Sequence, residues 1–277
     1  MKVEQRALSF GCDGCCLIGI VSVPRQPLAR GVLIVAGGPQ YRVGSHRQFT
    51  LLARHLAQQA IPVMRFDYRG MGDSEGAART FESVDDDLRC AVQAFFDSVP
   101  GLTEVVIWGL CDGASAAALY ARQDGRVCGL ILLNPWVRTE QGAARATLKH
   151  YYLGRLAERD FWRKLARGAV KPSVVFASLR QLLSASMQRT EDAPAQLPAR
   201  ILEGLVHFKG RMLIILSGDD LTAREFADLQ KSTAAWRELS SASRVQQMEL
   251  DGANHTFSRR DWRAQVAQLC ATWTTSW

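Results

Sequence analysis

Short apolar runs alternate with amphipathic segments along most of this chain. A fully apolar run of strand length occurs at residues 31–36, largely apolar runs occur at 61–67, 105–108, 129–135 and 211–218, and a last strand is predicted at 245–250. Such runs, bounded by turn residues, are typical of central strands in a parallel sheet covered on both faces. Helical spacing marks residues 49–59, 81–98 and 261–277. The alternation predicts an α/β fold with a mostly parallel, doubly wound sheet.

Two stretches depart from this alternation. Near the start, the apolar positions between Leu8 and Pro24 surround the turn dipeptide Asp13-Gly14 and predict an antiparallel hairpin that opens the sheet. After Trp136 the strand pattern stops, and residues 138–207 are helical in pattern and basic. We therefore expect an α/β core of residues 1–137 and 208–277, with a helical cap inserted at 138–207 that covers the site.

The composition is that of a soluble globular protein. The chain has 277 residues, of which 47% are hydrophobic and 22% charged, which suits one large domain carrying an insertion. No apolar run approaches the ~18 residues of a membrane span, so no transmembrane segment is expected. The polar start also lacks the apolar core of a signal peptide, which favours a cytoplasmic location.

The formal charge of +7 is concentrated in the expected cap. Between Arg138 and Lys171, nine basic residues stand against three acidic ones. Such a patch attracts anionic ligands, nucleic acid or a membrane surface, and a solvated helical face explains it equally well. Nucleic acid is not the partner we expect, because aromatic residues in the same stretch suit an apolar acyl pocket equally well.

Seven cysteines occur in the chain. An odd number without a secretion signal favours reduced thiols over a disulfide framework. Cys12-x-x-Cys15-Cys16 resembles half of a zinc site, but no second pair follows at metal-ligand spacing. These cysteines are better interpreted as part of the hairpin, so no metal and no cofactor is expected.

One cysteine has a pattern of its own. Gly109-x-Cys111-x-Gly113 joins an apolar run to an alanine-rich helix, and this is the nucleophile-elbow pattern G-x-S-x-G with sulfur in place of oxygen. The flanking glycines are needed because the strained turn leaves no room for neighbouring Cβ atoms. A free cysteine is more often a small buried hydrophobe, yet the strand-turn-helix context predicts that Cys111 is a nucleophile.

A cysteine nucleophile requires an imidazole, and a carboxylate to orient it. His255 follows the last predicted strand, and the chain order nucleophile, acid, histidine points to Ser217-Gly218-Asp219-Asp220 for the acid. Asp220 is favoured because the acid usually stands a few residues beyond the strand-end glycine. Asp219 remains the alternative.

An acyl-transfer site also needs two N–H donors for the oxyanion. The first expected donor is the amide of Asp112, which follows the nucleophile. The second is expected from the glycine-rich loop after residues 31–36, in which Pro39 has no N–H to give. Gly38 is the first choice there and Gln40 the second.

These segments together resemble the α/β-hydrolase superfamily over nearly the whole chain. The matching segments are residues 67–74, the elbow at Cys111, the acid region at Asp219 and Asp220, and Asn254-His255. Residues 67–74 form a D-x-R-G-x-G-x-S run, and we interpret their role as structural. Within the superfamily, residues 38–49, 108–115 and 217–223 are similar to the exosortase A system-associated hydrolase 1 family, whose bacterial members occur with exosortase and exopolysaccharide genes. The usual His-Gly of the oxyanion loop is replaced by Ala36-Gly37.

The function expected from these residues is cleavage or transfer of acyl groups from carboxylic esters or thioesters through a covalent acyl-enzyme on Cys111. The basic cap could receive a phosphate-bearing carrier such as coenzyme A or acyl carrier protein. The alternative is a binding protein that keeps the hydrolase fold without turnover, which the altered oxyanion loop favours.

Overall fold

The computed structural model describes residues 3–38, 40–137 and 197–277. It contains an eight-stranded sheet with the order β1-β2-β4-β3-β5-β6-β7-β8. The strands β3 to β8 are parallel to one another, while at one edge β2 pairs antiparallel with both β4 and β1. The strands are β1 (Val3–Cys12), β2 (Cys15–Pro24), β3 (Arg30–Val35), β4 (Val63–Phe66), β5 (Glu104–Leu110), β6 (Val127–Leu133), β7 (Arg211–Ser217) and β8 (Val245–Leu250).

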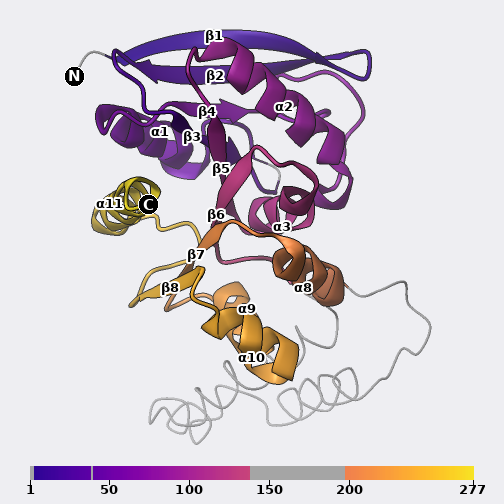
Figure 1. The fold of residues 1–277 in the computed structure, drawn as a ribbon, viewed down its shortest axis with the longest axis vertical. Coiled ribbons are helices and arrows are strands. Elements are labelled where there is room, and N and C mark those ends of the chain that lie inside the picture. Colours follow the sequence, from indigo (N-terminus) through magenta and orange to yellow (C-terminus); the bar gives the residue numbers. More distant parts are fainter. Residues whose placement is uncertain (1–2, 39, 138–196) are drawn as a thin grey trace, which may run out of the picture.

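Helices cover both faces of the sheet (Figure 1). The helices of the described residues are α1 (Gln48–Gln58), α2 (Asp85–Ser98), α3 (Asp112–Tyr120), α8 (Leu197–His207), α9 (Leu221–Ser232), α10 (Ala234–Ser241) and α11 (Arg260–Thr275), with short 3-10 turns at Ser45–Arg47, Phe81–Ser83 and Ala121–Gln123. One buried cluster joins the sheet to α2, α3, α8, α9 and α10, and a second joins its other face to α1 and α11. The predicted doubly wound α/β architecture is confirmed.

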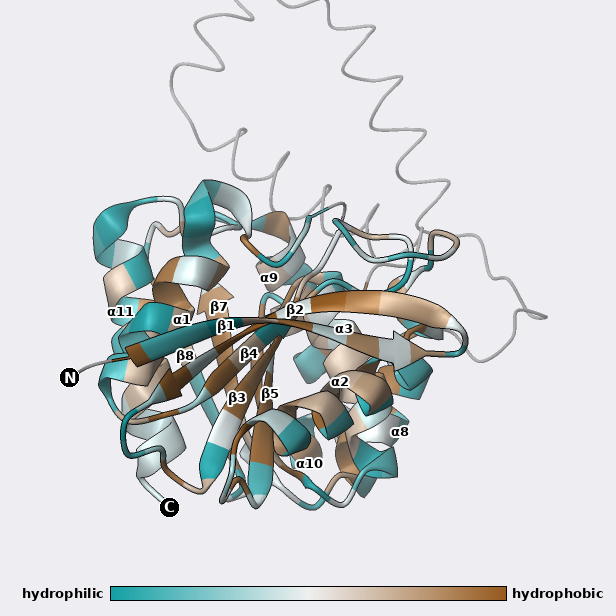
Figure 2. Ribbon diagram, turned by 90° about the horizontal axis from the view of Figure 1, so that it is seen from above, coloured by the Kyte–Doolittle hydropathy of each residue, from teal (hydrophilic) through white to brown (hydrophobic). Residues whose placement is uncertain are grey.

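The hydropathy pattern explains these two layers. Strands β3 and β4 are buried along nearly their whole length, and in Figure 2 the central strands are mostly brown whereas the outer helices carry teal. The predicted hairpin is also present, with Asp13 and Gly14 both at positive φ in its turn. The helical segment after β7 forms two helices, α9 and α10. The second one begins after Thr233, whose side-chain oxygen accepts the N–H of Trp236 and caps α10.

Helix α8 packs as part of the core layer. Its Ile201 and Leu205 are buried in the same cluster as α3, and a Cβ on Gly204 would overlap the carbonyl oxygen of Ala118. Helix α8 is the last part of the insertion expected at 138–207, and it packs closely against α3. The rest of the expected cap, residues 138–196 with its basic and aromatic residues, lies outside the described residues.

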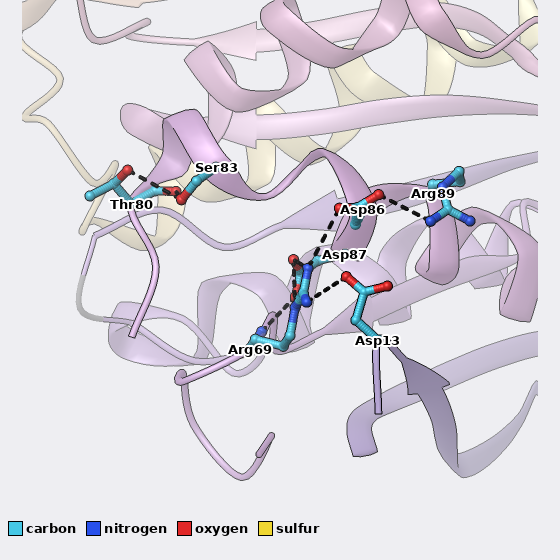
Figure 3. A network of polar contacts seen from close by, with 7 residues as sticks. All are labelled: Asp13, Arg69, Thr80, Ser83, Asp86, Asp87 and Arg89. Carbon is cyan, nitrogen blue, oxygen red and sulfur yellow. Dashed lines mark hydrogen bonds and ion pairs between the residues drawn. The ribbon is translucent and has the colours of Figure 1, made fainter. Parts of the chain in front are cut away.

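Buried ion pairs hold the loop after β4. The Arg69 guanidinium is 4% exposed and bonds the fully buried Asp87 carboxylate at the start of α2, with Nη2 to Oδ2 at 2.9 Å. Its Nη1 reaches Asp13 in the hairpin turn at 2.7 Å, so one side chain joins three elements (Figure 3). Asp67, in the same loop, pairs with Arg42 of the loop after β3. These contacts agree with the structural role expected for the Asp67 to Ser74 run.

None of the helices in residues 3–38, 40–137 and 197–277 is both long enough and apolar enough to cross a membrane.

Candidate active site

Cys111 stands at the tip of a sharp turn between β5 and α3. Its backbone has φ 59° and ψ −123°, a conformation that costs a non-glycine residue strain and is typical of functional turns. A Cβ on Gly109 would overlap the backbone of Gly113, and one on Gly113 would lie 2.7 Å from the carbonyl oxygen of Val35. The two glycines of the elbow pattern therefore permit this turn, and they leave the thiol half-buried at the sheet edge.

The parallel strands bring the predicted site residues to one edge of the sheet. Gly38 follows β3, Cys111 follows β5, Asp220 follows β7 and His255 follows β8. Ligands of open α/β sheets bind at the carboxyl ends of the strands, so all four positions lie at the edge where a site is expected.

The structure places Asp220, and not Asp219, beside the imidazole. Nδ1 of His255 lies 2.8 Å from Oδ2 of Asp220, whose side chain is 10% exposed. The same carboxylate caps α9 by accepting the N–H of Ala223 at 3.1 Å, which fixes its direction. The Asp219 side chain is 76% exposed and lies 3.7 Å from the guanidinium of Arg224.

The electrostatics around His255 favour the imidazolium. The hydrogen bond with Asp220, followed by one with the Cys111 side chain, raises the pKa of His255 from 6.5 to about 10, against the opposing effect of burial. The imidazole thus lies between an acid and a thiol, as a base that accepts the thiol proton must.

This shift predicts a pH-dependent contribution of His255 to stability. Because the folded state holds the imidazolium more tightly than the unfolded chain does, the contribution is fully present below pH 6.5 and is lost as the pH rises to about 10. Urea unfolding of the wild type and of His255→Asn should therefore give a stability difference that shrinks between these pH values. A difference that stays constant over the range would contradict the assignment.

A buried asparagine positions the histidine loop, and no motif in the sequence pattern pointed to it. Nδ2 of Asn134, just after β6, donates to the carbonyl oxygen of His255 at 3.0 Å and to Oγ of Ser217 at 2.8 Å. Oγ of Ser217 in turn donates to the carbonyl oxygen of Asn254 at 3.0 Å. One sequence feature could have indicated Asn134: it is a polar residue, followed by proline, at the end of an otherwise apolar strand.

The amides expected to bind the oxyanion lie beside the Asp112 carboxylate. Oδ1 of Asp112 accepts the N–H of Gly113 at 3.0 Å. Burial raises the pKa of this carboxyl group, although interactions with the backbone of Gly38, Gly113 and Asp112 act to lower it. The second-choice residue, Gln40, uses its side-chain Oε1 to accept the N–H of Ser45 at 3.1 Å.

A separate cavity of about 200 Å³ lies between α1 and α11. It is lined by Leu52, Trp108 and Phe257 with His55 and Arg263 at its polar side. None of the candidate catalytic side chains lines it. Within the part of the chain that the structure describes, no group of three or more His, Cys, Asp or Glu side chains could hold a metal ion.

Several solved structures have a similar fold. An esterase of Pyrococcus furiosus has 15% identity over 99% of this chain and 91% of its own, with a TM-score of 0.67. Est1E of Butyrivibrio proteoclasticus, solved with ferulic acid bound, has 14% identity over 98% of each chain and a TM-score of 0.63. A dienelactone hydrolase of Anabaena variabilis has 14% identity over 100% of this chain and 99% of its own, with a TM-score of 0.62.

At sequence identities this low, the structural similarity shows that these proteins share a fold. No curated protein matches the chain. The sequence model of the alpha/beta hydrolase family, however, matches residues 32–269, which span every strand from β4 to β8 and the whole elbow. The chain therefore belongs to the α/β-hydrolase family.

Proposed function

We propose that this protein is a hydrolase of carboxylic esters or thioesters that works through a covalent acyl-enzyme on Cys111. The observation that carries the proposal is the hydrogen-bonded series Asp220, His255 and Cys111 at the carboxyl edge of the sheet, with the cysteine on a strained turn. Two structural neighbours are named as an esterase and a dienelactone hydrolase. We propose that this protein acts on ester bonds as well.

The proposed reaction has two steps. In the first, His255 holds the thiol proton, the thiolate adds to the acyl carbon, and the leaving alcohol or thiol departs with that proton. In the second, His255 takes a proton from water, the hydroxide adds to the acyl carbon, and the Cys111 thiolate leaves. Asp220 keeps Nδ1 of His255 protonated, so Nε2 is the nitrogen that exchanges protons.

The donors proposed for the oxyanion are the amides of Gly38 and Asp112. Both interact favourably with the Asp112 carboxylate and act to lower its pKa, against the larger effect of burial, which supports their ability to bind an anionic oxygen. Hydrogen bonds to a developing oxyanion contribute more than bonds to the ground-state carbonyl, and each is worth about 3 kcal/mol in related sites.

A sulfur nucleophile favours thioesters among the substrates, because the exchange of one thiolate for another is nearly balanced in energy. We therefore include acyl thioesters of coenzyme A or acyl carrier protein, and transfer to an alcohol or amine in place of water, in the proposal. The resemblance to the exosortase A system-associated hydrolase 1 family adds the proposal that this chemistry belongs to exopolysaccharide metabolism.

Intact-protein mass spectrometry tests the proposal. The wild type and Cys111→Ala are incubated with a panel of 4-nitrophenyl esters and acyl-coenzyme A thioesters. We expect an added acyl mass on the wild type that is absent from the variant, together with release of nitrophenol or free thiol. The absence of both adduct and turnover with every donor would instead favour a binding protein that has the hydrolase fold without catalysis.

A further inference from the structure

The cavity between α1 and α11 is large enough for a small organic molecule. The two helices lie side by side against one face of the sheet (Figure 1), and the cavity between them has a volume of about 200 Å³. An apolar protein cavity of about 150 Å³ binds benzene. A molecule with one substituted aromatic ring therefore matches the size of this cavity.

Most residues of the cavity wall are apolar. The sheet contributes Trp108 of β5 and Leu133 of β6, and both are buried. Leu52 of α1, Ala267 of α11 and Phe257 of the loop after β8 also belong to the wall. Water makes few hydrogen bonds to such groups, and apolar cavities stay dry even at this size. The wall therefore favours a ligand with an apolar body.

The polar residues of the wall are donors and cations. They are Gln48, His55, Arg260 and Arg263, and no carboxylate of the described residues lines the cavity. Gln48 is 8% exposed, and its Nε2 has no hydrogen-bond partner in the described parts of the chain. Rotation about the side-chain bonds of Gln48 can turn this N–H₂ group toward an acceptor in the cavity. Because a buried donor without a partner is costly, an acceptor atom on the ligand is favoured.

Two arginines at the start of α11 give the wall a positive charge. Arg260 is exposed, whereas Arg263 is half-buried and donates through Nη1 to the carbonyl oxygen of Ser258. Among the described residues no carboxylate pairs with either guanidinium, and Asp261 of the same turn pairs with Arg259 at 2.8 Å. The helix dipole also favours an anion at this end of α11. The remaining guanidinium N–H groups can bind a carboxylate by charge-assisted hydrogen bonds.

The two kinds of wall restrict the ligand more than either does alone. An inorganic anion matches the arginines, but it loses its hydration against apolar groups that offer no hydrogen bonds in return. A neutral apolar molecule fills the space and leaves the charged groups and the Gln48 amide without a partner. A compact molecule with an apolar body and one carboxylate satisfies both parts of the wall.

We propose that the cavity between α1 and α11 is a second ligand site, which binds a small carboxylate with one aromatic ring or an apolar body of similar size. The carboxylate pairs with Arg263 and Arg260, and the apolar body packs against Trp108 and Phe257. The site is separate from the reaction proposed at Cys111, because none of the candidate catalytic side chains lines the cavity. Binding there is reversible and forms no covalent bond.

Two fluorinated probes of nearly equal shape test the site. Fluorine NMR follows the titration of the full-length protein with 4-fluorobenzoate and with 4-fluorobenzyl alcohol, which has a neutral hydroxyl group in place of the carboxylate. We expect saturable binding of the benzoate and an affinity at least about tenfold lower for the alcohol. Inorganic phosphate should compete with the benzoate at least about tenfold more weakly than unlabelled benzoate does. Equal affinities for the two fluorinated probes would overturn the inference, as would the absence of saturable binding, which would mean that water alone occupies the cavity.

Variants of α11 place the bound probe in the cavity. Arg263→Met should weaken binding of 4-fluorobenzoate at least about tenfold, whereas Arg259→Met, which removes a neighbouring arginine that does not line the cavity, should leave the affinity unchanged. Ala264 is an exposed residue of the wall. Ala264→Phe should fill the opening and abolish binding, and it decides the question if Arg263→Met fails to fold. Wild-type affinity in the folded variants would overturn the inference.

A variant of the candidate active site excludes binding at the imidazolium. A carboxylate is also the product of ester cleavage, so the probe could bind beside His255 instead. His255→Asn should keep the wild-type affinity for 4-fluorobenzoate, because His255 does not line the cavity. Loss of binding in His255→Asn with retention in Arg263→Met would place the carboxylate at Cys111 and overturn the second site. The proposed function is tested by acyl adducts on Cys111 and stands or falls independently of these titrations.

Discussion

Replacing Asp220 with asparagine is expected to lower the rate of Cys111 acylation and turnover by about 10³- to 10⁴-fold. The 2.8 Å bond to Nδ1 of His255 requires an acceptor, and only the carboxylate also stabilises the imidazolium. An asparagine amide can present its N–H₂ group to the imidazole instead, which favours the tautomer that cannot accept the thiol proton. The measurement is the rate of acyl-adduct formation and of nitrophenol release, compared at equal protein concentration.

Asparagine keeps the size of the side chain but not all of its contacts. The cap on the N–H of Ala223 and the bond to His255 both use Oδ2 of Asp220, so an asparagine that turns its N–H₂ group to the imidazole gives up the cap, which costs about 1 kcal/mol. The pair with the imidazolium is lost as well, so the thermal midpoint of Asp220→Asn should fall, and a wild-type circular dichroism spectrum at the assay temperature shows that the loss of rate is not a loss of folded protein.

Asp219→Asn is the matched comparison for this variant. Its side chain is largely exposed and its ionic partner is Arg224 at 3.7 Å, so the rate should change by less than about threefold, as expected for the loss of a surface charge. A large loss of rate in Asp219→Asn with a small one in Asp220→Asn would reverse the assignment of the acid.

The elbow and the edge of the sheet could be predicted from local sequence. The glycines around Cys111 are needed for steric reasons that any such turn imposes, and the apolar strand before it is visible in consecutive residues. The choice between Asp219 and Asp220 could not be made with the same certainty. It depends on the angle at which the chain leaves β7 and starts α9, and the cap on the N–H of Ala223 is what turns Asp220 toward the histidine.

Other features depend on contacts between distant parts of the chain. Asn134 and Ser217 are 83 positions apart and yet support the His255 loop together, so no local pattern shows their partnership. The packing of helix α8 depends on a distant contact in the same way. Helix α8 has the amphipathic pattern of any surface helix, and its contact with α3, where Gly204 meets Ala118, is what buries one of its faces. The direction of the Asp112 side chain is a rotamer choice that the sequence does not express.

Removal of the buried carboxylate of Asp87 is expected to cause a large loss of folding stability. The Asp87→Ala variant leaves the guanidinium of Arg69, which is 4% exposed, without its principal partner. Breaking a buried ion pair by removing one member costs about 3 to 5 kcal/mol, because the remaining charge stays buried without its partner. The half-exposed Asp13 still pairs with Arg69 at 2.7 Å, which places the expected loss toward the lower end of this range. Urea unfolding followed by circular dichroism measures this difference.

The neighbouring Asp86 supplies a control on the same turn of the same helix. Both residues lie in the first turn of α2, so both variants lose the same favourable interaction with the helix dipole. Asp86 is 55% exposed, pairs with Arg89 at 3.0 Å and lies 4.0 Å from Nη2 of Arg69, so Asp86→Ala loses only partly exposed pairs and should cost less than about 1 kcal/mol. Equal losses in the two variants would mean that the buried pair between Asp87 and Arg69 does not account for the effect.

A double variant then distinguishes the loss of a partner from the loss of packing. In Arg69→Met with Asp87→Leu, both charges are replaced by apolar side chains of similar size, and such replacements are often neutral. We expect the double variant to recover most of the stability that Asp87→Ala loses. If it is as unstable as Asp87→Ala, then the bonds that Arg69 makes to the hairpin turn at Asp13 and to α2 are themselves required to hold the loop after β4.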